Sequence, residues 1–282
     1  MKLCRIGKIG EEKPAIIDKD NNYRDLSSII EDLNPDTLNF NTLEKIEKAD
    51  ISSLPKLDTN LRIGACVSKP SKFIGIGLNF KDHAEEQNLP IPTEPIIFSK
   101  FTSCIAGPND PIIVPKGSDH TDWEVELGFV IGKKAINISV EKALDHVLGF
   151  FLVNDVSERN FQKNKGLTWD KGKGFDTFGP IGPYIVTKDE LPDFQKLDMF
   201  LDVDGKRMQT GNTEKMIFDI KTLVSYMSSC MSLHPGDICC TGTPPGVGEN
   251  MSPPKFLKGG EEVVLGIDKL GKQKHQVLPY KE

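Results

Sequence analysis

The stretch Asp122-Trp123-Glu124-Val125-Glu126-Leu127 alternates acidic and apolar side chains. In a β-strand, Glu124 and Glu126 would point to one face, while the apolar residues between and beside them would point to the other. Two neighbouring carboxylates repel each other, and a hard cation bound by oxygen ligands would remove that repulsion. The stretch therefore predicts either a metal-binding strand or a strand whose acidic face is exposed to solvent.

Another acidic residue follows a strongly apolar segment about thirty positions further on. The segment Leu148-Gly149-Phe150-Phe151-Leu152-Val153 predicts a buried strand, and Asn154-Asp155 comes directly after it. A carboxylate at the end of a buried strand is costly unless it is paired or bound to a cation. Asp155 is therefore a candidate third metal ligand, and the alternative is a helix N-cap for the segment that begins at Val156.

A candidate general base lies upstream of both segments. Residues 73–79 predict a strand with close backbone approaches at its glycines, and residues 80–87 predict a short polar helix. His83 and Glu86 are three positions apart and would share a helix face. A carboxylate beside an imidazole fixes its tautomer, as a base that activates water requires. A surface ion pair is the alternative.

These segments, in this order, resemble the fumarylacetoacetate hydrolase family, and further fragments downstream extend the resemblance over residues 73–248. The fragments that carry the resemblance are Gly77-Leu78-Asn79-Phe80-Lys81-Asp82-His83-Ala84-Glu85-Glu86, Pro95-Ile96-Ile97-Phe98-Ser99-Lys100, Asp122–Leu127, Val153–Arg159, Lys171-Gly172-Lys173-Gly174-Phe175-Asp176-Thr177-Phe178-Gly179-Pro180, Gly211-Asn212-Thr213 and Thr241-Gly242-Thr243-Pro244-Pro245-Gly246-Val247-Gly248.

The resemblance implies a metal site and its cofactor. The ligands of the family match Glu124, Glu126 and Asp155 in this chain. The metal that the resemblance implies is Mg2+, and Mn2+ and Ca2+ accept the same oxygen ligands.

The resemblance also implies catalytic and substrate-binding residues. The catalytic pair of the smaller, acylpyruvase-like members matches His83 and Glu86, in a segment that acts as a lid over bound ligand. The active-site lysine of the family matches Lys173, although a glycine-lysine loop such as this is also typical of a solvated turn. The positions that line the substrate pocket match Arg159, Gln162, Thr177 and Thr243.

The chemistry that these residues predict is cleavage of a carbon–carbon bond in a 2,4-diketo acid. The substrate would be an acylpyruvate or a 2,4-diketo-3-deoxy sugar acid, and the products would be pyruvate and a carboxylic acid. Oxaloacetate tautomerisation or decarboxylation, a ureidoglycolate lyase reaction and a non-enzymatic protein that binds 2-oxo acids are the alternatives. We expect substrate specificity to come from the lid, residues 86–93, and from the loop at residues 250–254.

Whole-chain properties narrow the class of protein. The 282 residues include 35 basic and 41 acidic side chains, and the net charge of −6 argues against a nucleic-acid surface. No apolar stretch reaches the roughly 20 residues that span a membrane. The N-terminus has no signal or transit character, and the six cysteines lack the spacing of a zinc or redox site, so a cytoplasmic protein is expected.

The organisation that we expect has two parts. Residues 1–60 predict a small N-terminal α+β domain, with short strands near Leu3–Ile6 and Ala15–Ile17 and a helix near Leu43–Lys48. Residues 61–282 predict the catalytic domain, with helices at Val140–His146 and Phe218–Met231. The resemblance implies that the fold is mainly β with some α, a mixed β-sandwich roll, and that the common assembly is a homodimer.

Overall fold

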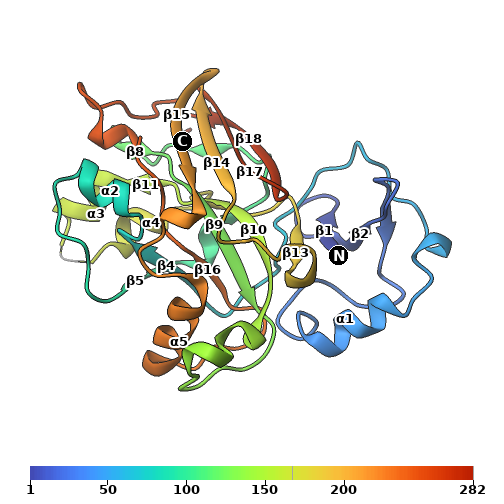
Figure 1. Ribbon diagram of the computed structural model, residues 1–282. Helices are drawn as coiled ribbons and strands as arrows, with labels where there is room; N and C mark the ends of the chain where they lie inside the picture. Colours follow the sequence, from blue (N-terminus) through green and yellow to red (C-terminus); the bar gives the residue numbers. More distant parts are fainter. Residues whose placement is uncertain (167, 282) are drawn as a thin grey trace.

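The computed structural model describes residues 1–166 and 168–281, and its fold is mainly β with some α in several sheets. The largest sheet has nine strands in the order β3-β2-β1-β13-β10-β9-β16-β4-β5 (Figure 1). Its strands, in chain order, are β1 (Lys2–Ile6), β2 (Lys13–Ile17), β3 (Tyr23–Asp25), β4 (Phe73–Gly77), β5 (Ile96–Lys100), β9 (Val125–Ile131), β10 (Val147–Asn154), β13 (Ile185–Thr187) and β16 (Ile238–Cys240).

A second sheet of five strands packs on the first, in the order β15-β14-β17-β18-β7. Its strands are β7 (Ile112–Ile113), β14 (Asp198–Val203), β15 (Lys206–Asn212), β17 (Glu262–Ile267) and β18 (Gly271–Leu278). Gln273 of β18 is buried and donates hydrogen bonds of 3.0 Å to the carbonyl oxygens of Leu152 in β10 and of Gly182. Because a buried amide needs such partners, Gln273 fixes one sheet against the other.

Two short strand pairs and five α-helices complete the regular structure of the described residues. The pairs are β6 (Ile105–Ala106) with β12 (Gly179–Pro180), and β8 (Thr121–Asp122) with β11 (Ser157–Glu158). The helices are α1 (Phe40–Glu47), α2 (Lys81–Glu86), α3 (Arg159–Asn164), α4 (Asp170–Lys173) and α5 (Ile220–Cys230). The 3-10 helices are η1 (Ile51–Ser53), η2 (Thr102–Cys104), η3 (Val140–His146), η4 (Lys188–Glu190), η5 (Thr213–Lys215) and η6 (Gly248–Asn250).

The longer helices begin at side-chain caps. Asn39 accepts a hydrogen bond from the backbone N–H of Thr42 at the start of α1, and Asp219 accepts one from Thr222 at the start of α5. Such caps satisfy backbone donors that have no partner within the helix. The predicted helix at 218–231 is confirmed as α5, whereas the one predicted at 140–146 is the 3-10 helix η3.

The N-terminal strands belong to the large sheet. β1 pairs with β13 in antiparallel orientation, with Lys2 opposite Val186 and Leu3 opposite Ile185. In Figure 1, β1, β2 and α1 form a lobe at one side of the molecule, next to β13. The division at residue 60 into two domains stays a prediction. No helix among the described residues is long and apolar enough to cross a membrane.

Candidate active site

The three predicted metal ligands come together because of the register between β9 and β10. Val125 lies opposite Asn154, and the backbone N–H of Asp155 donates to the carbonyl oxygen of Glu124 at 2.9 Å. Residues directly opposite each other share a face of an antiparallel pair, so Asp155 lies beside Glu124 and diagonally from Glu126. The start of β9 and the end of β10 thus bring three carboxylates to the same part of the sheet.

All three carboxylates are buried, with exposed fractions of 5% for Glu124, 2% for Glu126 and 0% for Asp155. The alternative of a strand whose acidic face is exposed to solvent is therefore wrong. The opposite face of the strand, which carries Trp123, is buried as well. The alternative of an N-cap at Asp155 is also wrong. Helix α3 begins at Arg159, and its cap is Glu158, which accepts from the backbone N–H of Phe161.

Basic side chains surround the carboxylates. Lys173 Nζ lies 2.7 Å from an oxygen of Glu124 and 2.7 Å from an oxygen of Asp155. Arg159 binds the other oxygen of Glu124 at 2.7 Å and also binds Asp122 at 2.8 Å. Lys173 is 2% exposed, so the alternative of a solvated glycine-lysine turn is wrong.

Lys100 is a member of this cluster that the sequence analysis did not identify. Its Nζ lies 2.6 Å from Asp155 Oδ1 and also donates to the backbone carbonyl oxygen of Lys173. The signal was present in the alternation of β5, where Phe98 and Lys100 point inward and Ser99 points outward. A charged residue on the inward face of a strand requires a buried partner.

The charges of this cluster shift the pKa values of its acids in opposite directions. Burial alone would raise the pKa of Glu124, but Lys173 and Arg159 hold it well below its ordinary value. The pKa of Glu126 lies well above its ordinary value because of burial and the nearby charges of Asp155 and Glu124. Lys173 has a raised pKa, because Asp155 and Glu124 outweigh the effect of its burial.

The cluster fits a divalent cation. It holds the four acids Asp122, Glu124, Glu126 and Asp155, against the three bases Lys100, Arg159 and Lys173. Glu126 accepts from the backbone N–H of Gly242 at 2.7 Å, and its carboxylate lies within 4.8 Å of an oxygen of Asp155 and of the Cys240 sulfur. Carboxylate-rich sites of this kind select hard ions such as Mg2+, Mn2+ or Ca2+.

The predicted base and its partner are hydrogen-bonded to each other in α2. His83 Nδ1 lies 3.0 Å from Glu86 Oε2, and His83 is only 6% exposed, whereas Glu86 is exposed. The alternative of a surface ion pair therefore fits Glu86 but not the buried imidazole. Glu86 also accepts from the backbone N–H of Gly246 and from Asn250, both at 3.1 Å. These bonds lower the pKa of Glu86 although burial acts against them.

The tautomer of His83 follows from these contacts. An ionised Glu86 accepts a hydrogen bond from the Nδ1–H of His83, so Nε2 carries the lone pair of the neutral ring. The side-chain amide of Gln87 lies 2.7 Å from that nitrogen and therefore acts as its donor. His83 Nε2 is thus the basic atom of the pair.

A cavity of about 230 Å³ joins the base to the carboxylates. His83, Glu124, Glu126, Asp155 and Lys173 all line it. The remaining lining residues are Ile76, Gly77, Leu78, Gln87, Leu89, Ile96, Phe98, Arg159, Gln162, Lys163, Trp169, Gly242, Thr243, Val247 and Glu249. Of the segments expected to set specificity, the lid contributes Gln87 and Leu89, whereas residues 250–254 are not among the lining residues.

The other predicted pocket residues have different positions. Gln162 lines the cavity and accepts from Arg159 at 3.1 Å. Thr243 also lines it, but its hydroxyl donates to the carbonyl oxygen of Val125 and accepts from Gln209, so it is engaged in the scaffold. Thr177 is not a lining residue, since its hydroxyl accepts from the backbone N–H of Ile113 at 3.0 Å.

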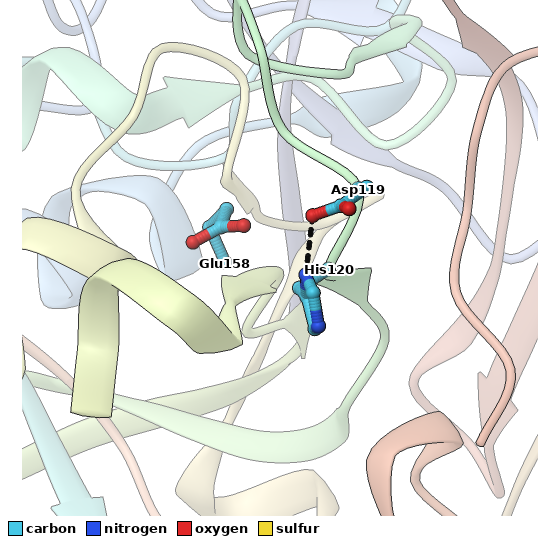
Figure 2. A group of neighbouring side chains, drawn as sticks. All are labelled: Asp119, His120 and Glu158. Carbon is cyan, nitrogen blue, oxygen red and sulfur yellow. Dashed lines mark hydrogen bonds and ion pairs between the residues drawn. The ribbon is translucent and has the colours of Figure 1, made fainter. Parts of the chain in front are cut away.

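A second group of potential ligands lies at Asp119, His120 and Glu158 (Figure 2). The Glu158 carboxylate is already engaged, because one oxygen accepts from Ser118 and the other caps α3. His120 binds Asp119 and packs on Phe256 at a centroid distance of 4.7 Å. We assign this group no chemistry, as its only buried acid serves the helix.

Comparison with known proteins places the chain in a family. The family model for the fumarylacetoacetate (FAA) hydrolase C-terminal region matches residues 72–278. A Burkholderia ambifaria (strain MC40-6) protein named as a putative hydrolase is 55% identical over 274 residues, 97% of each chain. The chain therefore belongs to the fumarylacetoacetate hydrolase family.

Solved structures agree with this fold over the whole chain. A probable 2-hydroxyhepta-2,4-diene-1,7-dioate isomerase from Mycobacterium abscessus is 29% identical with a TM-score of 0.85, and covers 100% of both chains. Maleylpyruvate hydrolase from Sphingobium sp. SYK-6, solved with manganese (II) ion and pyruvate, is 26% identical with a TM-score of 0.82, again over 100% of both chains. Hydrolases and isomerases thus share this fold, and members of the family are enzymes.

Proposed function

We propose that this protein is a metal-dependent hydrolase that cleaves 2,4-diketo acids into pyruvate and a carboxylic acid. One observation carries the proposal: the imidazole of His83, which is hydrogen-bonded to Glu86, and a buried carboxylate cluster line the same small cavity. A base is required to activate water, and a cationic site is required to hold a 2-oxo acid. The Sphingobium hydrolase, solved with manganese and pyruvate, supports the same combination.

Glu124, Glu126 and Asp155 would hold the metal, with Mg2+ or Mn2+ as the proposed ion. When bound, the ion supplies Lewis-acid stabilisation of negative charge on the oxygens of the 2-oxo acid. Lys173 adds a fixed positive charge beside two of these ligands, and Arg159 adds another at Glu124. Both cations favour an anionic substrate in the cavity.

His83 takes the proton from the attacking water. Glu86 keeps the Nδ1 proton in place and stabilises the imidazolium that forms, while Nε2 is the accepting atom. Water must displace the amide of Gln87 from Nε2 before it can be activated, since both use the same lone pair. The lid residue Gln87 therefore moves, or rotates its side chain, in each catalytic cycle.

The atoms balance as follows for an acylpyruvate. The water oxygen forms a bond to C4, and the bond between C3 and C4 breaks, with its electron pair left on the three-carbon fragment. One water proton reaches C3 from the His83 imidazolium and completes the methyl group of pyruvate. The other leaves with the carboxylic acid, so no oxidant or further reactant is needed.

A panel of acylpyruvates and 2,4-diketo-3-deoxy sugar acids, assayed for pyruvate with Mg2+, with Mn2+ and with chelator, tests this function. Metal-dependent release of pyruvate and carboxylic acid in equal amounts is expected from at least one member. Absence of pyruvate from every member, in protein shown to bind the metal, would contradict the proposal.

A second candidate function is isomerisation of an unsaturated or enolic 2-oxo acid. The Mycobacterium abscessus structure described as an isomerase favours it, because proton transfer by His83 alone would be sufficient. Oxaloacetate tautomerisation belongs to the same class of chemistry, whereas oxaloacetate decarboxylation would break a carbon–carbon bond and release carbon dioxide. Shift of a double bond or decay of an enol with the carbon skeleton intact would distinguish this class from hydrolysis.

The remaining alternatives have their own readouts. A ureidoglycolate lyase would release urea and glyoxylate, and a non-enzymatic protein would bind 2-oxo acids without turnover. The basic lone pair of His83 argues for an enzyme, since a binding protein has no use for it. A homodimer stays a prediction, and sedimentation of the purified protein would test it.

A further inference from the structure

The residues that line the cavity are of two kinds. The charged and polar residues include the buried carboxylates, Lys173 and His83. The apolar residues, which together we call the apolar wall, include Ile76, Leu89, Ile96, Phe98, Trp169 and Val247. Polar groups fix the orientation of a ligand, whereas an apolar wall selects for the part that lies against it.

Two aromatic rings belong to the apolar wall. The rings of Phe98 and Trp169 are tilted by 53°, with centroids 5.5 Å apart. Phe98 also lies next to the charged group, because Lys173 Nζ is 5.2 Å from its ring centroid. A ligand held by the charged cluster would therefore reach this aromatic wall with the atoms that follow its anionic end.

Gly77, at the end of β4, makes room for the indole ring. A Cβ at this position would lie 2.2 Å from an atom of Trp169, a distance that real Cβ atoms essentially never show. Any larger residue at 77 would displace the ring. The absence of a side chain at Gly77 thus leaves room in the cavity for the large flat apolar surface of Trp169.

The apolar residues reach the mouth of the cavity. Leu89 is 46% exposed and Ile96 is 37% exposed, although both line it. Large exposed apolar side chains grouped at a cavity mouth indicate a surface that a ligand covers.

Several polar groups that line the cavity are engaged with one another. Lys163 binds Glu249 at 2.7 Å, and Glu249 lies 3.6 Å from Arg159. The carbonyl oxygen of the Gln162 side chain accepts from Arg159, and the amide of Gln87 donates to His83. The buried Nη2 of Arg159 has no hydrogen-bond partner among the described residues, so it is left to bind the anionic end of a ligand. A hydroxyl group against the rings of Phe98 and Trp169 would lose its hydration without gaining such a partner.

We propose that the substrate carries a short acyl group at C4 whose end is apolar and packs against Phe98 and Trp169, and that a hydroxylated end is disfavoured. This inference rests on the proposed function, as it names the substrate class of the same site. The size of the cavity, about 230 Å³, is below the roughly 300–1,000 Å³ of sites for drug-sized ligands, which limits the acyl group to a few carbons.

A matched pair of substrates tests the inference. The two 2,4-diketo acids would be identical except at the end of the acyl group, which is a methyl in one and a hydroxymethyl in the other. We expect kcat/KM to favour the methyl end by about tenfold or more, the range that one group in an apolar pocket can supply. Equal values, or a preference for the hydroxymethyl end, would overturn the inference.

Binding measurements separate this inference from the proposed reaction. Unreactive 2-oxo acids with the same two ends would be titrated calorimetrically into the Mn2+-loaded protein, with oxalate as a ligand that has no tail. Tighter binding of the methyl-ended acid would support the inference even if no substrate releases pyruvate, an outcome that would remove the proposed function alone. Equal binding of both would overturn the inference.

Two variants connect the preference to the aromatic wall. Trp169→Ala should abolish the preference for the methyl end and leave oxalate binding unchanged, and Gly77→Ala should weaken binding of tailed acids while sparing oxalate. Tyr280→Ala, which removes an exposed aromatic ring outside the cavity lining, is the matched control. An unchanged preference in a folded Trp169→Ala variant would overturn the assignment of the wall.

Discussion

Single buried charges determine what the active site can hold. Glu126 is 2% exposed, and the only hydrogen bond to its carboxylate among the described residues comes from the backbone N–H of Gly242. Nearby negative charge raises its pKa, so it would be the ligand most relieved by a bound cation. Glu124, in contrast, is already neutralised by Lys173 and Arg159.

Glu126→Gln should abolish activity by weakening metal binding, while the metal-free protein keeps or gains stability, because a neutral side chain relieves the repulsion from Asp155 and Glu124. We expect Mn2+ affinity to fall by more than the roughly 10–100-fold that changes around metal ligands cost. Calorimetric titration and thermal unfolding measure the two effects, with the exposed Glu141→Gln as the control. Full activity would refute the metal assignment.

Lys100→Met should destabilise the metal-free protein by about 3–5 kcal/mol, the range for removal of one partner from a buried ion pair. The reason is that Asp155 would lose the Nζ contact at 2.6 Å, and the carbonyl of Lys173 would lose its donor. Urea denaturation measures the change, and Lys142→Met, at an exposed lysine, is the control. A loss of less than about 1 kcal/mol in the free energy of unfolding would show that Lys100 does not stabilise the carboxylate of Asp155.

At the residue scale, the sequence contained the proposed metal ligands but not their partners. Alternation around Glu124 and Glu126, and the apolar run before Asp155, indicate acids that require a positively charged partner where they are buried. The contacts of Lys100 and Gln209 depend on strand order, which no local pattern encodes. Thr177 matches a sequence motif of the family, yet its hydroxyl binds the backbone N–H of Ile113 and the residue does not line the cavity.

Helix α2 is the element that carries the base. It follows β4 in the chain, and the bonds from Gly246 and Asn250 to Glu86 attach it to the segment 246–250. A six-residue helix is too short to be stable by itself, so these contacts hold it in place. The order of α2 therefore depends on its contacts with residues 246–250.

His83→Ala should suppress hydrolysis by about 10²–10⁴-fold, the usual contribution of a general base, and leave oxalate binding largely intact. Oxalate needs the charged cluster and no base. Stopped-flow turnover and calorimetry measure the two effects. Loss of oxalate binding in a folded variant would make His83 a ligand contact and not a base.

At the element scale, local sequence patterns were sufficient to predict several strands and helices. The strands at 73–79 and 148–153, the polar helix at 80–87 and the helix at 218–231 were predicted close to their observed bounds. Residues 140–146 form a 3-10 helix that packs against α5. Packing against another element decides between the two helix types, and local propensity does not.

The whole molecule depends on contacts between its first sixty residues and the rest. Arg62 binds both oxygens of Asp110, which precedes β7, and also binds Glu12 at 2.8 Å. Burial acts against ionisation of Asp110, but the bonds from Arg62 and from the Gly107 N–H keep its pKa below the ordinary value. Ionised Asp110 therefore joins the N-terminal strands to the larger part of the fold.

Asp110→Asn should lower stability at pH 7 and make it less sensitive to acid. The stabilisation from Asp110 is fully present above the ordinary pKa of about 3.9 and is lost as the pH falls through the lower folded-state value. Denaturation of wild type and variant between pH 7 and pH 2 should thus converge at the acid end. A difference that stays constant over this range would contradict the linkage.

At this scale the sequence alone predicted less. The order of nine strands, with β16 between β9 and β4, joins segments far apart in the chain, and only the family resemblance anticipated a mixed β roll. Hydrophobic patterns identify strands but not their neighbours, because pairing depends on contacts that lie outside any local window.

The most direct test of the central claim is turnover of an acylpyruvate in water labelled with heavy oxygen, with Mn2+ present. Hydrolysis predicts pyruvate and a carboxylic acid in equal amounts, with one labelled oxygen in the new carboxyl group and no reaction in Glu126→Gln. An intact carbon skeleton without label in a carboxyl group, in protein that binds Mn2+, would contradict the account and make the enzyme an isomerase.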